Sequence, residues 1–396
     1  MYLPATQQRF ITSVQSALHE YDTELKAINN KIWSNPELGY AEHQAHNNIC
    51  SLFDALTPHG YKVTRSAYGL ETAFEITYTN SSKANRTIVF NAEYDALPGI
   101  GHACGHNLIA TSSIAAFLAT CEALKSYTGE KSTTPSYTIR LLGTPAEESG
   151  GGKVRLLENG AYKDVDACLM VHPFPIAPQN PELLSMATVV PGEFLANDKL
   201  TVTFVGKPSH AAAAPWEGVN ALDAVVSTPN VIPMSATVDY YVRSPTKKSL
   251  KALTAKVVKC FEAAATATGC GMEIEWGISY DDLKSNTPIC ESYVSAMRAM
   301  GHQTILNNAG QTGMLTSGST DMGNVPYAVP IFHGLFTIPA EGVNHTPLFT
   351  NGAGSPEAHE RSLACAAGMA VVACQIAVDD EFAKRVKEDF VMEMEE

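Results

Sequence analysis

The segment that decides the fold is RTIVFNAEYDALPGIGHACGHNLIATSSIAAFLATCEALKSY (86–127). Its first six residues, RTIVFN, form an apolar and β-branched run that is typical of a buried strand. The next part, EYDALPGIGHACGH (93–106), is punctuated by Gly and Pro and is expected to be a loop. The rest of the segment is apolar over helical length. The segment therefore predicts one strand–loop–helix unit of an α/β fold.

The same order of elements recurs along the chain. SYTIRLL (136–142) and DACLMV (166–171) predict two further buried strands. PYAVPIFHGLF (326–336) predicts another, before a last helix over about 356–377. Strands that alternate with helices favour a mainly parallel sheet flanked by helices. In such sheets, functional sites form beyond the carboxyl ends of the strands.

A different pattern interrupts this fold between 194 and 310. Three segments alternate apolar and polar positions, as half-exposed strands do, and a helix is expected between each strand and the next. The strands are KLTVTFVGK (199–207), SATVDYYVRSP (235–245) and EIEWGISYDD (273–282), and the helices are EGVNALDAVV (217–226) and SLKALTAKVVKCFEAAATA (249–267). We therefore predict a discontinuous catalytic domain from 1–193 and 311–396, and a small α+β lid domain from 194–310.

Composition argues against several classes of protein. The 396 residues carry 27 Lys and Arg against 41 Asp and Glu, which gives a formal net charge of −14 and argues against a nucleic-acid partner. The nine cysteines lack the dense spacing of a disulfide scaffold. No apolar run of about 18 residues is found, and the first residues lack the apolar block of a signal peptide. We therefore expect no membrane partner and a cytoplasmic location.

Side chains that bind metals follow the predicted strands. Cys104 and His106 come after the first strand, Glu148 after the second and His172 after the third, while His345 lies in a later loop. Thiolate, imidazole and carboxylate groups are ligands for zinc and similar ions. Each motif alone is also compatible with an ordinary loop, turn or solvated pair. Their joint placement at one edge of a sheet favours a metal site.

Two further carboxylates, Glu147 and Asp95, could assist a metal site without binding the metal themselves. Adjacent glutamates point in different directions, so Glu148 can bind a metal while Glu147 acts as a base. Asp95 is placed to accept a hydrogen bond from a ligating histidine. A catalytic zinc usually has three protein ligands, so five candidates indicate two ions about 3.5–4 Å apart. A structural zinc is the competing interpretation, but the chain has no CxxC pair, and it also lacks a GxSxG elbow.

An ordered set of motifs covers nearly the whole chain and resembles one family. The set is WSNPELGYAE (33–42), AEYDALPGIGHACGHN (92–107), TPAEESGGG (144–152), VHP (171–173), GKPSHAAAAPWEGVNALDA (206–224), PNVIP (229–233), YYVRSPT (240–246), GSTDMGNV (318–325) and NHTP (344–347). It is similar to the M20 metallopeptidases, in the branch with auxin-conjugate amidohydrolases and hippurate hydrolases. Within that branch it most resembles dipeptidases that act on β-alanyl-lysine and Xaa-Arg dipeptides.

The resemblance implies a hydrolase that cleaves amide bonds in dipeptides or N-acyl amino acids with water activated by two divalent ions. The ions would be zinc, with manganese or cobalt as alternatives. By matching position, the metal ligands would be Cys104, His106, Glu148, His172 and His345. Cys104 would replace the bridging aspartate of more distant relatives, and Glu147 would be the general base.

The resemblance also implies roles for the lid domain. His210 resembles a histidine that relatives lend across a dimer to the tetrahedral oxyanion, and Asn230 resembles an asparagine that contacts the substrate carboxylate. A homodimer through the lid domain would follow.

One departure from the family pattern concerns this lid domain. Only Val225, Val226, Ser227 and Thr228 separate ALDA (221–224) from PNVIP. The end of a helix and one strand, about thirty residues in the family pattern, are therefore missing. The alternative function that this shortening suggests is a catalytically impaired metal-binding homologue or assembly partner.

Overall fold

The computed structural model describes residues 5–81, 85–127, 136–175, 188–190, 194–210, 215–225, 232–306 and 318–395. The chain forms two compact units. The large unit comprises Met1–Gly192, Lys284–Leu315 and Asn324–Glu396, and the small unit comprises Glu193–Leu283 and Thr316–Gly323.

The described residues of the large unit form a sheet of eight strands in the order β1-β2-β4-β3-β5-β11-β6-β10. The strands are β1 (Lys62–Arg65), β2 (Phe74–Thr79), β3 (Arg86–Ala92), β4 (Tyr137–Gly143), β5 (Ala167–Pro175), β6 (Thr188–Val190), β10 (Thr304–Leu306) and β11 (Ile331–Ile338). The central strands β4, β3, β5 and β11 pair in parallel, whereas β1–β2, β2–β4 and β6–β11 pair antiparallel. The predicted mainly parallel sheet is confirmed, with antiparallel strands added toward its edges.

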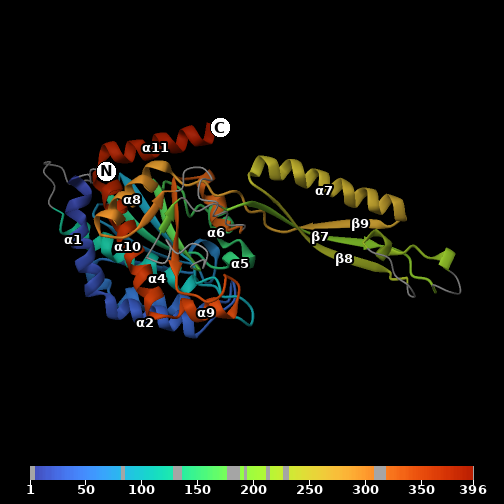
Figure 1. Cartoon of the computed structure of the whole chain (residues 1–396), viewed down its shortest axis with the longest axis horizontal. Helices are drawn as coiled ribbons and strands as arrows, with labels where there is room; N and C mark the ends of the chain where they lie inside the picture. Colours follow the sequence, from blue (N-terminus) through green and yellow to red (C-terminus); the bar gives the residue numbers. More distant parts are fainter. Residues whose placement is uncertain are drawn as a thin grey trace. The chain divides into compact units, whose positions relative to one another are not determined.

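Helices flank this sheet (Figure 1). They are α1 (Ala5–Glu20), α2 (Asp22–Ser34), α3 (His43–Ala55), α4 (His106–Lys125), α5 (Glu147–Gly150), α6 (Gly152–Glu158), α8 (Thr287–Ala299), α9 (Pro347–Ala353), α10 (Pro356–Val378) and α11 (Asp380–Glu395). Helices α4 and α10 pack against each other and against the central strands. Both are long and apolar enough to cross a membrane, but 94% and 83% of their apolar windows are buried inside the structure, as in core helices.

The boundary of the insertion differs from the sequence expectation. We expected the lid domain to run to 310, whereas the structure assigns Lys284–Leu315 to the large unit. Helix α8 packs against α10 and α11, and its side chains Cys290, Tyr293 and Met297 belong to the large core. A later segment of the chain, Thr316–Gly323, belongs to the small unit.

The small unit is an antiparallel sheet of three described strands covered by one helix (Figure 1). The strands β7 (Ala196–Val205), β8 (Ser235–Ser244) and β9 (Gly271–Trp276) lie in the order β8-β7-β9, and the helix is α7 (Lys247–Thr268). From Leu200 to Phe204 every second residue of β7 is buried, so one face of this part of the strand forms the core. Where the family pattern leads us to expect a long helix, the chain has a four-residue 3-10 turn, Ala221–Ala224.

Candidate metal centre

The candidate ligands of the large unit lie at the carboxyl ends of neighbouring strands. The loop that follows β3 leads to Cys104 and His106, the turn that follows β4 carries Glu147 and Glu148, and His172 lies near the end of β5. Because β4, β3 and β5 are parallel neighbours, these three ends meet at one edge of the sheet.

Among the described residues, three groups of side chains come close enough to hold a metal ion, and within each group the ligand atoms lie within 4.8 Å of one another. The groups are Cys104, His106 and His172; Cys104, Glu148 and His345; and His106, Glu147 and Glu148. Cys104 belongs to the first two groups, and its Sγ lies 3.3 Å from His172 Nε2. Two of the candidate groups therefore share the Cys104 sulfur, and the third shares His106 with one group and Glu148 with the other.

His106 is fixed by its own backbone and by Asp95. The preceding Gly105 has φ +78°, and a Cβ there would lie 2.5 Å from Cγ of Pro173, so only glycine fits. His106 Nδ1 lies 2.9 Å from Asp95 Oδ1, which confirms the contact expected from the sequence. Burial alone would lower the pKa of His106, but the Asp95 carboxylate outweighs it and holds that pKa well above its usual range.

The electrostatics of the other ligands also follow from burial. Burial lowers the pKa of His172 to about 4, so its ring is neutral at pH 7. His172 Nδ1 donates to the Pro173 carbonyl oxygen at 2.7 Å, which leaves the Nε2 lone pair for a metal. Burial raises the pKa of the Cys104 thiol. A bound cation would displace that proton, because the thiolate is the ligand.

Glu147 and Glu148 follow a backbone elbow at Ala146, which has φ +57°. The Glu148 N–H donates to Asp95 Oδ2 at 3.0 Å, so one carboxylate orients both His106 and Glu148. Glu148 Oε2 lies 3.5 Å from His345 Nε2, and Glu147 Oε2 lies 3.8 Å from His106 Nε2. Glu148 Oε1 also lies 3.8 Å from His106 Nε2, so both glutamates lie beside His106 and Glu148 additionally approaches His345.

Two buried polar atoms test whether metal ions fit these residues. His106 Nε2 and Glu148 Oε1 are buried, and within the described part of the chain neither makes a hydrogen bond. Such atoms are costly to bury without a partner. Cations held by thiolate, imidazole and carboxylate would satisfy them, so the residues fit a metal centre.

A buried ion pair beside this centre was not predicted. Lys153 Nζ lies 2.5 Å from Glu93 Oε1, and both side chains are buried. Glu93 Oε2 lies 3.5 Å from His106 Nε2. The signal that could have found this pair is a lone lysine in the segment GGKVRLL (151–157), whose apolar positions are otherwise core-like.

Two further predicted site residues lie outside the described part of the large unit. His210 is exposed and belongs to the small unit. Asn230 lies outside the described residues.

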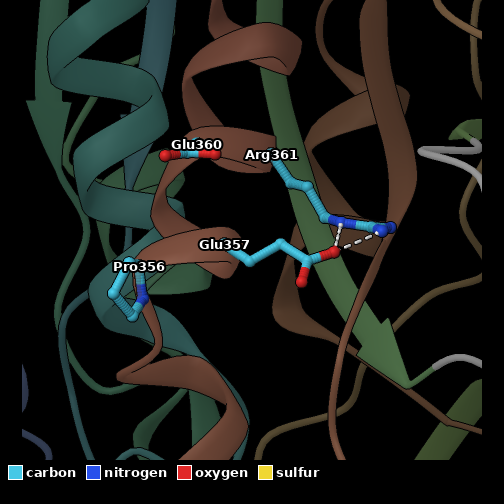
Figure 2. A pocket seen from close by; sticks show the side chains of 4 residues that line it. All are labelled: Pro356, Glu357, Glu360 and Arg361. Carbon is cyan, nitrogen blue, oxygen red and sulfur yellow. Dashed lines mark hydrogen bonds and ion pairs between the residues drawn. The ribbon is translucent and has the colours of Figure 1, made fainter.

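A surface pocket lies elsewhere in the large unit, at the start of α10 (Figure 2). Pro356, Glu357, Glu360 and Arg361 line it, and none of them is a candidate ligand. Figure 2 shows the Arg361 guanidinium meeting the Glu357 carboxylate, at 2.7 Å. Arg361 also donates to Thr337 Oγ1 at 2.8 Å, so the positive charge that lines this pocket is held by contacts within the large unit.

Comparison with known proteins identifies the family to which this chain belongs. The family described as "Peptidase family M20/M25/M40" matches residues 89–348. The chain belongs to this family. The match includes every candidate ligand and Glu147, and it confirms the resemblance seen in the motifs.

Similar proteins indicate the class of enzyme to which this chain belongs. The chain is 36% identical to the Xaa-Arg dipeptidase of Mus musculus over an alignment of 411 positions, which covers 96% of this chain and 91% of the mouse protein. The Homo sapiens Xaa-Arg dipeptidase is equally similar. A component of the p-aminobenzoyl-glutamate hydrolase of Escherichia coli is 27% identical over 74% of this chain and 65% of its own length. The protein is therefore a hydrolase of the peptidase and amidohydrolase class.

Solved structures share the fold. A dinuclear metal-binding peptidase of the M20 family from Bacillus subtilis matches with a TM-score of 0.67 and 19% identity, over 91% of this chain and 99% of that one. An aminohydrolase from Staphylococcus aureus gives a TM-score of 0.69 and 18% identity, over 94% and 100% of the two chains.

Proposed function

We propose that this protein is a two-metal dipeptidase that hydrolyses dipeptides with a basic carboxyl-terminal residue. The observation that carries the proposal is the pair of ligand groups that share Cys104, with the Glu147 carboxylate beside them. The basic residue in the proposed substrate rests on similarity to the Xaa-Arg dipeptidases over 96% of the chain.

In this proposal Cys104, His106 and His172 hold one ion, and Cys104, Glu148 and His345 hold the other. Two bound divalent ions, zinc or alternatively manganese or cobalt, would supply an acidic water and an electrophile for the scissile carbonyl.

The remaining groups handle protons and charge. Glu147 accepts a proton from the attacking water and returns it to the leaving amine. The buried Asp95 keeps the His106 ring in one orientation during this cycle. His210 donates a hydrogen bond to the developing oxyanion, and Asn230 contacts the substrate carboxylate.

A substrate panel tests the proposal. Purified protein with added Zn²⁺, Mn²⁺ or Co²⁺ is incubated with Ala-Arg, Ala-Lys, Ala-Leu and N-acetyl-arginine, and product amines are measured. We expect the fastest release from Ala-Arg and Ala-Lys, and none after chelation with EDTA. Cleavage of N-acetyl-arginine alone would overturn the dipeptidase assignment. Metal binding without turnover of any substrate would favour the non-catalytic partner, which no comparison supports.

A further inference from the structure

The segment ELGYAE (37–42) lies against the elbow that carries Glu147 and Glu148. This segment is the second half of the WSNPELGYAE motif, and the proposed mechanism does not use it. A Cβ on Gly39 would lie 2.9 Å from the Ala146 Cβ, so the two backbones approach closely. The Tyr40 hydroxyl donates to the Gly150 carbonyl oxygen at 2.6 Å. Glu42 Oε1 accepts a hydrogen bond from the Ala146 N–H at 2.8 Å.

The elbow needs such support because Ala146 is left-handed. Its φ of +57° is unfavourable for a residue with a Cβ. A backbone in this conformation persists only where its surroundings hold it, and such positions gather at functional sites. Relaxation of Ala146 would rotate the following peptide groups and redirect the Glu147 and Glu148 side chains. Two carboxylates hold the backbone of the elbow. Glu42 accepts a hydrogen bond from the N–H of Ala146 itself, and Asp95 accepts one from the N–H of Glu148, two residues later.

Glu42 is suited to this task by its own surroundings. The residue is fully buried, and its second oxygen accepts a hydrogen bond from the Thr72 hydroxyl at 2.7 Å. Burial raises the pKa of Glu42 to about 7. Both protonation states offer an oxygen to the Ala146 N–H, so the hydrogen bond does not require a charge.

We propose that Glu42 is a positioning residue that fixes the left-handed Ala146 through its N–H and thereby aims Glu147 and Glu148 at the metal centre. Tyr40 supports the other end of the same turn through Gly150. This inference rests on the proposed function, because it assigns Glu147 as the base and Glu148 as a ligand.

Three variants separate positioning from general stability. Glu42→Ala removes the acceptor, Glu42→Gln keeps an oxygen for the Ala146 N–H, and Thr72→Val removes only the hydroxyl that donates to Glu42. For Glu42→Ala we expect kcat on Ala-Arg to fall about 100-fold with little change in KM, since small misplacements of catalytic groups cost about this much. We also expect Zn²⁺ affinity, measured by competition with a chromophoric chelator, to fall. Glu42→Gln and Thr72→Val should each stay within about threefold of wild type.

Other results would overturn the inference. A folded Glu42→Ala protein with wild-type kcat and Zn²⁺ affinity would show that the contact does not position the elbow. Equal loss in Glu42→Gln and Glu42→Ala would show that charge matters rather than the hydrogen bond. Equal loss in Thr72→Val would show that disturbing the buried segment is sufficient.

A further variant keeps the test informative if Glu42→Ala does not fold. Ala146→Gly relieves the left-handed strain, so we expect an unchanged or higher Tm together with a lower kcat, because the elbow gains freedom. An unchanged kcat in Ala146→Gly would contradict the inference. If the wild-type protein cleaves no dipeptide, the proposed function fails by itself. The Zn²⁺ affinities of the Glu42 variants still test the positioning of Glu148.

Discussion

The large and the small unit differ in how firmly they hold the side chains assigned to the site. In the large unit, His106, Cys104 and Glu147 are buried, whereas the proposed ligand His345 is exposed. Asp95 binds both His106 and the backbone of Glu148. In the small unit, His210 is exposed. Buried groups are fixed by packing before substrate arrives, whereas an exposed group depends on its local loop. We therefore expect the largest effects from substitutions in the large unit.

The sharpest test of this difference is Glu147→Gln. The substitution keeps the shape of the side chain but removes the base, so kcat on Ala-Arg should fall about 1,000-fold. Metal content, measured by mass spectrometry of the bound ions, should stay at the wild-type level. Turnover above a tenth of the wild-type rate would remove Glu147 from the mechanism.

Glu42→Gln should change how stability depends on pH. The folded pKa of Glu42, about 7, lies above the ordinary value of 4.5, so wild type loses stability as pH rises through this window. Gln carries no such proton. The free energy of unfolding of Glu42→Gln minus that of wild type should therefore rise by about 3 kcal/mol between pH 4.5 and 7. Urea unfolding at pH 5 and pH 8 measures this, and a constant difference would show that Glu42 is not perturbed by burial.

His210→Ala tests the contribution of the small unit to catalysis. Loss of one oxyanion donor typically lowers kcat about 100-fold, less than we expect for Glu147→Gln. Metal content should not change, because His210 is not a proposed ligand. A loss equal to that of Glu147→Gln would mean that the exposed group is as critical as the buried base.

Asp95→Asn should have the smallest of these effects, which is a lower affinity for the metal. Partners of ligating histidines typically contribute between about 10- and 100-fold in metal affinity. Asp166→Asn is a matched control, because the Asp166 carboxylate accepts a backbone N–H from Thr87 without contacting a histidine. Calorimetric titration with Zn²⁺ compares the two variants. Equal Zn²⁺ affinities of the two variants would show that Asp95 does not contribute to metal binding.

The sheet could be predicted because local patterns determine its strands, and the same patterns place the candidate ligands after those strands. Apolar runs mark β3, β4 and β5, and the polar or Gly-rich segments that follow them carry Cys104, His106 and Glu148. Parallel pairing then brings those segments to one edge. The boundary near 284 was missed because the apolar face of α8 fits either unit by pattern alone.

The supporting contacts could not be predicted from the sequence. The Glu42 carboxylate meets the Ala146 backbone across 104 residues of chain, and no periodicity encodes that pairing. The Lys153–Glu93 ion pair likewise depends on packing that only the fold reveals. The shortening of the small unit stays a prediction, which rests on the missing stretch of motif between ALDA and PNVIP.

The central claim is that two ions share the sulfur of Cys104. Equilibrium dialysis against buffered Zn²⁺, followed by elemental analysis, measures bound metal per chain for wild type and Cys104→Ala, with circular dichroism to confirm that both are folded. The account predicts two equivalents for wild type and less than one for Cys104→Ala, because both ligand groups lose a member. Two equivalents in both proteins, or none in wild type, would contradict it.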